Sequence, residues 1–174
     1  MAYDVTVETG APRRMYVLRG EALAQECFGK ILRMDVPLAA NTVTFGGAKS
    51  LLWLGPEEWL LNVPEGEDDP LDGGFSPNDC EETAVVVDVS DHYSVIRIHG
   101  SETVDVLAQA CGIDLLPESF APGQCARCSF ARTTGIVRPL DDRGGYEVII
   151  ESSYAQYAEQ WLTNAIGMSP SDQA

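Results

Sequence analysis

The sequence predicts an α+β protein that is built from two similar βαββ halves. In each half a strand ends at a glycine, Gly20 or Gly100, and an amphipathic helix follows. A proline stands at the same distance behind each glycine, Pro37 in the first half and Pro117 in the second. One helix covers only one face of a small sheet, so a second copy is needed to bury the remaining apolar surface. The expected product is a pseudo-dimer with mostly antiparallel, ferredoxin-like sheets and helices on one side.

Short apolar runs, alternating or continuous, predict the strands of the first half, residues 1–64. They are expected at 3–8, 15–19, 43–45, 49–54 and 59–63. Between Glu21 and Ile31 the apolar residues recur at helical spacing, which predicts a helix. This helix should end before Pro37, because a proline ring disfavours helix in the residue that precedes it.

The second half, residues 83–167, holds the clearest pattern of the chain. Its strands are expected at 84–89, 93–99, 124–131, 133–138 and 146–150. The first two of these are expected to form a hairpin across Ser90–Asp91, and the last two a hairpin across residues 141–145. The final strand, YEVII, matches the run WLLNV that ends the first half.

Two helices are predicted in the second half. Ser101 is expected to cap the first helix at its N-terminus. Its buried stripe, at helical spacing, consists of Val104, Leu107, Ala108 and Cys111. The second helix begins at Ser152 or Ser153, buries the side of Trp161 and ends at Gly167. Residues 168–174 are expected to be a disordered tail.

Residues 65–82 stand where the first half would need a closing helix. They are rich in acidic residues, proline and glycine, which predicts a solvated, mobile connection between the halves. The acidic run DDPLDGG (68–74) lacks the alternating oxygen ligands and the terminal glutamate of a calcium-binding loop. Calcium binding is therefore excluded.

Composition narrows the partners and the compartment. The chain carries 27 acidic and 11 basic residues, for a net charge of −16. This balance argues against nucleic acid and against anionic membrane surfaces, since both recruit Lys and Arg. The N-terminal residues do not form a signal peptide, and no apolar run is long enough to span a membrane. Five scattered cysteines are typical of reduced thiols in a cytoplasmic protein.

One pair of cysteines, Cys125 and Cys128, has the spacing of half a zinc site or of a redox pair. Structural zinc needs four ligands, and only Cys111 is close in sequence. A redox pair belongs at a helix N-terminus, whereas this pair falls in a predicted strand. Residues three apart in a strand point to opposite faces. The pair is therefore interpreted as two ordinary cysteines.

The remaining candidates for chemistry cluster between residues 88 and 101. His92 and His99 would need a nucleophile such as Ser90, Ser94 or Ser101, but the chain has no Gly-x-Ser-x-Gly motif. Asp88 and Asp91 are better explained by capping of the turn. The glycine pairs in FGGAK and RGGYE do not form a nucleotide-binding motif. We expect no catalytic, cofactor-binding or metal-binding residues in this chain.

Four segments of the sequence resemble the gamma subunit of heterotetrameric sarcosine oxidase. They are LWLGPEEWLL (52–61), VVDVSDHYSVIRIHG (86–100), DLLPESFAPGQCAR (114–127) and SSYAQYAEQWL (152–162), with a weaker match over 15–37. The chain departs from the family pattern at Cys128, where a small polar residue is expected, and in the acidic segment 65–80.

The resemblance implies a T-protein-like fold, related to the folate-binding region of the glycine cleavage T-protein. It also implies a non-catalytic, structural subunit that docks on a large alpha subunit. The complex oxidises sarcosine to glycine and forms peroxide and methylene-tetrahydrofolate. FAD, FMN, NAD, tetrahydrofolate and zinc are then expected in the partner subunits and not in this chain. The alternatives are the equivalent subunit of a related N-methyl amino acid dehydrogenase and a free-standing folate-binding or one-carbon module.

Overall fold

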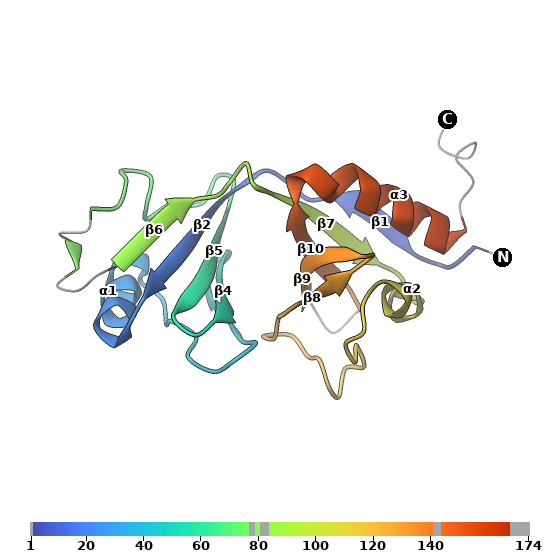
Figure 1. Cartoon of the computed structure of the whole chain (residues 1–174), viewed down its shortest axis with the longest axis horizontal. Helices are drawn as coiled ribbons and strands as arrows, with labels where there is room; N and C mark the ends of the chain where they lie inside the picture. The colour runs from blue at the N-terminus through green and yellow to red at the C-terminus, as the bar shows by residue number, and fades with distance from the viewer. Residues whose placement is uncertain (1, 77–78, 81–83, 141–143, 168–174) are drawn as a thin grey trace. The chain divides into compact units, whose positions relative to one another are not determined.

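The computed structural model of the chain describes residues 2–76, 79–80, 84–140 and 144–167. The chain divides into two compact units. The middle unit consists of Ala11–Ser90, and the terminal unit combines Met1–Gly10 with Asp91–Ala174. Each unit contains an antiparallel five-stranded sheet with its helices (Figure 1), which confirms the predicted fold class.

The middle unit begins with β2 (Arg13–Gly20) and α1 (Ala22–Leu32). Three strands follow as a meander, β3 (Val43–Gly46), β4 (Lys49–Gly55) and β5 (Glu58–Pro64). The last strand is β6 (Ala84–Asp88). The order across the sheet is β3-β4-β5-β2-β6, and every pair is antiparallel.

The terminal unit repeats this arrangement. Its elements are β1 (Thr6–Thr9), β7 (Tyr93–His99), α2 (Thr103–Ala110), β8 (Ala126–Phe130), β9 (Thr133–Pro139), β10 (Tyr146–Glu151), a short 3-10 turn (Ser152–Tyr154) and α3 (Ala155–Ile166). Its sheet has the order β1-β7-β10-β9-β8. Gly167 ends α3 in the left-handed conformation, as predicted. Of the predicted β9–β10 turn, residues 141–143 lie outside the described part, as does the tail 168–174.

The two units do not follow the boundaries predicted from the sequence. β1 pairs with β7 in the terminal unit, although it precedes β2, and β6 pairs with β2 in the middle unit, although it precedes β7. The predicted hairpin between 84–89 and 93–99 is therefore wrong, because its two strands belong to different sheets. Alternation shows which side chains a strand buries, but it does not show which neighbour the strand pairs with. Each repeat thus gives its first strand to the sheet of the other repeat.

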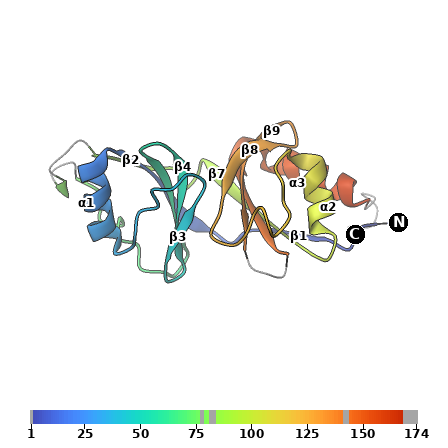
Figure 2. The same ribbon diagram turned by 90° about the horizontal axis from the view of Figure 1, so that it is seen from below.

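The core of the terminal unit lies between its sheet and the two helices α2 and α3 (Figure 2). α2 begins at Thr103, later than predicted, and its N-cap residue Glu102 makes no side-chain capping bond. The buried stripe of α2 is consequently shifted from the predicted one and consists of Thr103, Val106, Leu107 and Ala110. Gly100, just before the helix, has φ of 142°, and a Cβ there would collide with the Asp4 carbonyl group. This close approach explains why glycine stands at the end of β7.

The core of the middle unit lies between its sheet and α1, and the acidic segment after β5 completes it. Leu71 and Cys80 are buried in this core, and the Phe75 ring lies 6.2 Å from that of Phe28 in α1. A disulfide joins Cys27 in α1 to Cys80. Most described residues of 65–82 are exposed, in agreement with a solvated connection, but a few apolar residues and one covalent bond attach the segment to the core. The prediction of five reduced thiols is wrong for this pair.

The face of each sheet that points away from the helices is also buried. In the middle unit one row across three strands joins Val17, Leu60 and Leu52 in direct register. The next row joins Met15, Asn62 and Ser50, and the Asn62 Oδ1 and Ser50 Oγ atoms are buried without a hydrogen-bond partner among the described residues.

Candidate functional site

Asp88 and Ser90, the first pair of candidates, form a turn in the middle unit. The Ser90 hydroxyl and the Ser90 backbone N–H both donate to Asp88 Oδ1. The Ser90 Oγ in turn accepts a hydrogen bond from the Met15 backbone N–H at 3.0 Å. These bonds to Ser90 lower the pKa of the Asp88 carboxyl below its usual value, and the Arg14 guanidinium adds to the effect. All of these groups are occupied in fixing the chain as it leaves β6.

The histidines and remaining serines lie in the terminal unit and do not form a catalytic constellation with one another. The His92 ring contacts that of Tyr93 edge-on, with centroids 4.7 Å apart. His99 faces Glu8 at 3.5 Å across the β1–β7 pair, and both side chains are largely exposed. The Ser94 hydroxyl donates to Ser152 Oγ, which donates to the Asp91 carbonyl oxygen. The interpretation of His92, Ser94 and Asp91 as turn and strand-end residues is consistent with these bonds.

Ser101 is not the cap of α2. Its hydroxyl donates to Asp4 Oδ2 at 2.6 Å, while Glu102 Oε2 accepts a hydrogen bond from the Asp4 backbone N–H, also at 2.6 Å. Ser101 therefore bonds to the segment before β1 and not, as the sequence predicts, to the N-terminus of the helix. Sequence spacing could not reveal this bond, since Asp4 and Ser101 are far apart along the chain.

The cysteines pair differently from the spacing in the sequence. Cys125 is buried just before β8, and Cys128 lies partly buried within β8. The thiol of Cys128 contacts that of Cys111, which directly follows α2. Among the described residues, no group of three or more His, Cys, Asp or Glu side chains is arranged to hold a metal ion.

The contact between Cys111 and Cys128 changes the acidity of both thiols. Interaction with the Cys128 thiol lowers the pKa of Cys111 to about 7, and interaction with Cys111 raises the pKa of Cys128. The Cys111 thiol also donates to the Leu107 carbonyl oxygen at 3.3 Å. Burial raises the pKa of the nearby Tyr146, whose hydroxyl donates to the Leu115 carbonyl oxygen at 2.7 Å. Cys111 follows the end of α2 and Cys128 lies in β8, so their approach depends on how the helix packs on the sheet.

A buried ionic row crosses the terminal sheet and was not predicted. Glu147 is fully buried in β10, and its Oε1 accepts hydrogen bonds from Arg138 Nε at 2.9 Å and Nη2 at 2.7 Å. Its Oε2 accepts a longer bond of 3.4 Å from Arg97 Nε. The three residues stand opposite each other in register on β9, β10 and β7. A carboxylate that is fully buried and held by two arginines in this way is interpreted as a structural group.

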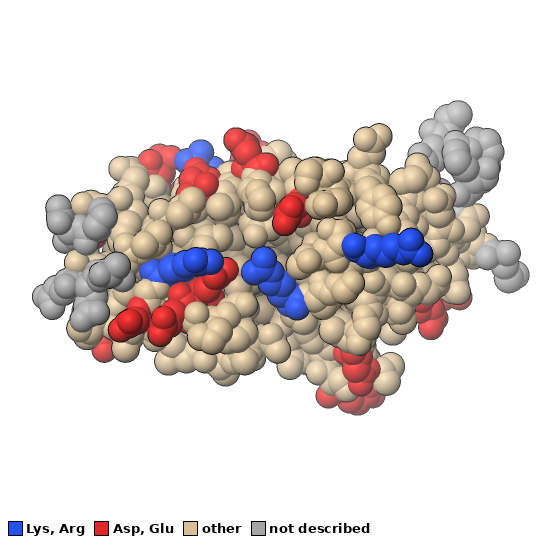
Figure 3. Space-filling model, in the orientation of Figure 1, with Lys and Arg blue, Asp and Glu red and all other residues tan. Residues whose placement is uncertain are grey.

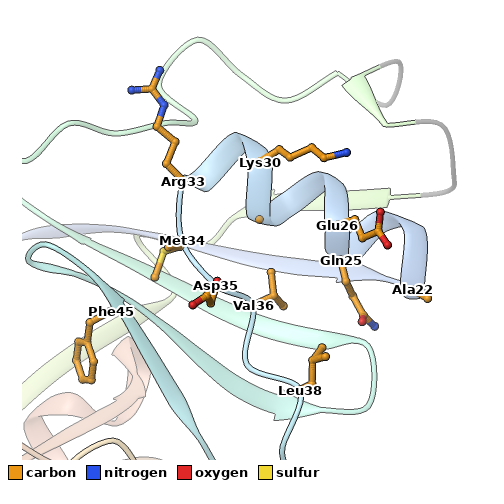
Figure 4. A pocket seen from close by; sticks show the side chains of 11 residues that line it. Ala22, Gln25, Glu26, Lys30, Arg33, Met34, Asp35, Val36, Leu38 and Phe45 are labelled. Atoms are coloured by element: carbon orange, nitrogen blue, oxygen red, sulfur yellow. The ribbon is translucent and has the colours of Figure 1, made fainter.

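A groove of about 930 Å³ lies beside α1 in the middle unit (Figure 4). Val36 and Leu38, from the segment after α1, lie along one side of it. Lys30 and Arg33 belong to its rim and point away from Leu38 in the view of Figure 4. Leu38 and Phe45 are the two most exposed large apolar side chains of the described residues, at 69% and 58%. The groove therefore presents apolar side chains beside charged groups of both signs, the cations Lys30 and Arg33 and the carboxylates Glu26 and Asp35.

These features can be compared with known proteins. A family model described as the sarcosine oxidase, gamma subunit family matches residues 20–168. The chain belongs to this family. The resemblance seen in the sequence is thereby confirmed. None of the described helices is long and apolar enough to cross a membrane.

Individual members of the gamma subunit family are distant from this chain. The sarcosine oxidase subunit gamma of Corynebacterium sp. (strain P-1) is 26% identical over 147 residues, which cover 84% of this chain and 70% of that protein. The subunit of Corynebacterium sp. (strain U-96) is 27% identical over 119 residues, and the match covers 67% of this chain and 56% of the relative. The chain thus spans little more than half of the length of that relative.

One solved structure has the same fold. A chain of the heterotetrameric sarcosine oxidase from Corynebacterium sp. U-96, in complex with pyrrole 2-carboxylate, superposes with a TM-score of 0.85 at 23% identity. The superposition covers 94% of this chain and 84% of that chain. At this identity the likeness establishes the fold.

Proposed function

We propose that this chain is the gamma subunit of a heterotetrameric, flavin-dependent sarcosine oxidase. The match of the family model to residues 20–168 carries the proposal. The polar candidates support it, because Asp88, Ser90 and Ser101 are all engaged in bonds that shape the backbone. A structural role in a complex needs a stable fold and a docking surface, and the middle unit supplies an exposed apolar groove.

The chemistry is proposed to take place in the partner subunits. FAD, FMN, NAD, tetrahydrofolate and zinc would be bound there, and this chain would dock on the large alpha subunit. The complex would act in the cytoplasm, where glutathione and thioredoxin would reduce accessible disulfides. Alkylation of thiols in intact cells tests this compartment. Cys27 and Cys80 are joined in the structure, and a disulfide between them that is reduced in the cell would leave both thiols open to alkylation.

The groove beside α1 is the surface that we propose for docking. A contiguous patch of exposed apolar side chains marks a protein interface when it is larger than the patches on ordinary monomers. On the face shown in Figure 3, charged side chains lie in small separate groups among uncharged residues. Four charged side chains line the groove, the cations Lys30 and Arg33 and the anions Glu26 and Asp35. The matching surface of the alpha subunit would place apolar side chains against Leu38 and Phe45 and opposite charges against the charged side chains of the groove.

Co-purification tests the proposed function. The tagged chain is expected to bring down a flavoprotein complex with sarcosine-dependent peroxide production from its native cell. Recovery of the chain alone under gentle conditions would refute the proposal. Calorimetry of the purified chain with a reduced folate is expected to show no heat of binding, whereas binding would favour a free-standing folate module.

Two charge insertions test the groove separately. Leu38→Asp and Phe45→Asp are expected to weaken the recovery of the complex at least tenfold, because each buries a carboxylate in an apolar contact. Leu116→Asp is the matched control, since Leu116 is 55% exposed in the terminal unit. Loss of the complex with the control alone would place docking elsewhere and leave the family assignment intact.

A further inference from the structure

Cys111 and Cys128, which form no disulfide with each other in this structure, lie close together in the terminal unit. Cys111 follows the last residue of α2, and Cys128 lies in β8, the edge strand of the sheet. Cys128 packs against the apolar core that contains Cys111, and the two thiols interact electrostatically. A backbone bond of 2.8 Å from the Ala131 N–H to the Ala110 carbonyl oxygen fixes the end of β8 against the end of α2. The two thiols therefore face each other across a rigid contact.

The two thiols differ in burial and in acidity. Cys111 is 5% exposed and packs in the core, whereas Cys128 is only partly buried. Cys128 is thus the more accessible of the two sulfurs. The low pKa of Cys111, near 7, keeps a substantial share of this thiol as thiolate at neutral pH. Thiolate is the form that attacks peroxides and disulfides.

We propose that Cys111 and Cys128 form a redox-active dithiol that hydroperoxides oxidise to an intramolecular disulfide. A thiolate sulfur attacks the O–O bond of the hydroperoxide, which leaves a sulfenic acid and, after protonation, releases water or an alcohol. The sulfur of the second cysteine then displaces the hydroxyl group of the sulfenic acid, and a water molecule leaves. The dithiol loses two electrons and two protons, and the hydroperoxide gains them.

The disulfide would tie the end of α2 to the edge strand β8. The middle unit already has a bond of this kind, because Cys27–Cys80 joins α1 to the segment that completes its core. Cys125, buried and close to Cys128 in the sequence, is left without a role in this chemistry. The Cys-x-x-Cys spacing of the sequence is therefore not the pair that reacts.

Peptide mapping of the full-length chain tests the proposal. The purified protein is treated with a small excess of hydrogen peroxide at neutral pH, alkylated and digested with trypsin and a glutamate-specific protease. Cleavage after Glu118 and Arg127 places Cys111, Cys125 and Cys128 on three separate peptides. We expect a cross-link between the peptides of Cys111 and Cys128 that dithiothreitol reverses. The thiols open to alkylation after unfolding should fall from three to one.

Three variants complete the experiment. Cys128→Ser is expected to abolish the cross-link and to leave a sulfenic acid on Cys111 that dimedone traps, and Cys111→Ser is expected to abolish the cross-link in the same way. Cys125→Ser, the matched control, should retain the full yield. A cross-link through Cys125, or oxidation of Cys128 to sulfinic acid without a cross-link in the wild-type chain, would overturn the proposal. Three thiols that remain open to alkylation after peroxide would overturn it as well.

Discussion

The middle and terminal units have different residues at equivalent positions of β5 and β10. Trp59 in β5 and Tyr146 in β10 are both buried, and both begin the matching runs of the two repeats. The Trp59 indole N–H donates to the Pro37 carbonyl oxygen at 2.8 Å, and the Tyr146 hydroxyl donates to the Leu115 carbonyl oxygen at 2.7 Å. Each bond fixes the segment that follows the helix of the repeat. Both side chains therefore make the same kind of hydrogen bond, although one is Trp and the other Tyr.

The helix-free faces of the two sheets differ more deeply. The row Val17–Leu60–Leu52 of the middle unit corresponds to the row Arg97–Glu147–Arg138 of the terminal unit. The same backbone positions are apolar in one repeat and charged in the other. Three charges are tolerated here because the two arginines flank one carboxylate and their hydrogen bonds satisfy it.

The units also differ in what closes the core. In the terminal unit α3 packs on the sheet through Ala158, Leu162 and Ile166. In the middle unit the acidic segment takes this place with Leu71, Phe75 and the Cys27–Cys80 disulfide. A covalent bond can thus stand in for a helix, because it restricts the unfolded chain as well as the folded one.

The ionic row gives the largest expected effect. Glu147→Ala should destabilise the protein by about 3–5 kcal/mol, since it leaves two arginines without their buried partner. The free energy of unfolding is measured by urea denaturation followed by circular dichroism. A loss below about 1 kcal/mol would show that the row is open to water.

A transplant of the middle-unit row sharpens the same comparison. The triple variant Arg97→Val, Glu147→Leu and Arg138→Leu is expected to recover the stability lost in Glu147→Ala, because apolar residues often replace buried ion pairs at no cost. If the triple variant is as unstable as the single one, the two faces are not interchangeable.

The disulfide of the middle unit should have the next largest effect. Cys27 and Cys80 are 53 residues apart in the sequence, and opening such a loop costs roughly 2–4 kcal/mol of stability. The double variant Cys27→Ser, Cys80→Ser should therefore increase amide hydrogen exchange in α1 and β2 of the middle unit. Exchange in α2 and α3 serves as the internal control. Equal protection of α1 in the variant and the wild-type chain would contradict this account.

The two aromatic donors predict a matched pair of smaller losses. Trp59→Phe and Tyr146→Phe each remove the donor and keep a ring, so each should cost about 1–3 kcal/mol through an unpaired buried carbonyl group. Thermal unfolding of both variants measures the loss, and a loss in only one of them would break the proposed equivalence. Trp59→Phe includes a further loss of volume, so Trp59→Tyr is a useful second variant.

Sequence reasoning located most of the elements because local signals fix them. The α1 and α3 helices, the β4–β5 and β9–β10 pairs and the repeat itself follow from periodicity, turn residues and matching runs. The exchange of β1 and β6 between the sheets could not be predicted, since pairing depends on contacts such as the bonds from the Gly10 and Val89 N–H groups to the Val95 and Met15 carbonyl oxygens. The packing of Leu71 and Phe75 on the core was also missed, because these two apolar residues stand among many polar ones.

The sites follow the same division. Asp88 and Ser90 were correctly interpreted as turn residues. The Asp side chain readily accepts a hydrogen bond from the backbone N–H two residues later, and Asp88 Oδ1 accepts one from Ser90. The contact between Cys111 and Cys128 and the partners of Glu147 depend on tertiary structure, and no local pattern marks them. The family assignment came from matching motifs and gives no residue a catalytic role.

The smallest expected effect lies where β6 leaves the middle unit. Asp88 anchors this point through Ser90, whereas the corresponding point after β1 has Gly10, which has no side chain to anchor it.

Because the folded-state pKa of Asp88 lies below its usual value of 3.8, the carboxylate contributes stability above that value and loses it as the pH falls through the folded pKa. Asp88 is 49% exposed, so solvent screening limits the contribution to about 0.5 kcal/mol. Asp88→Asn should therefore lower the free energy of unfolding by this amount at pH 7, and the gap to the wild-type chain should close below pH 3.8. Urea titrations at several pH values measure it, and a gap that persists in acid would mean that the Asp88 side chain acts through shape and not through charge.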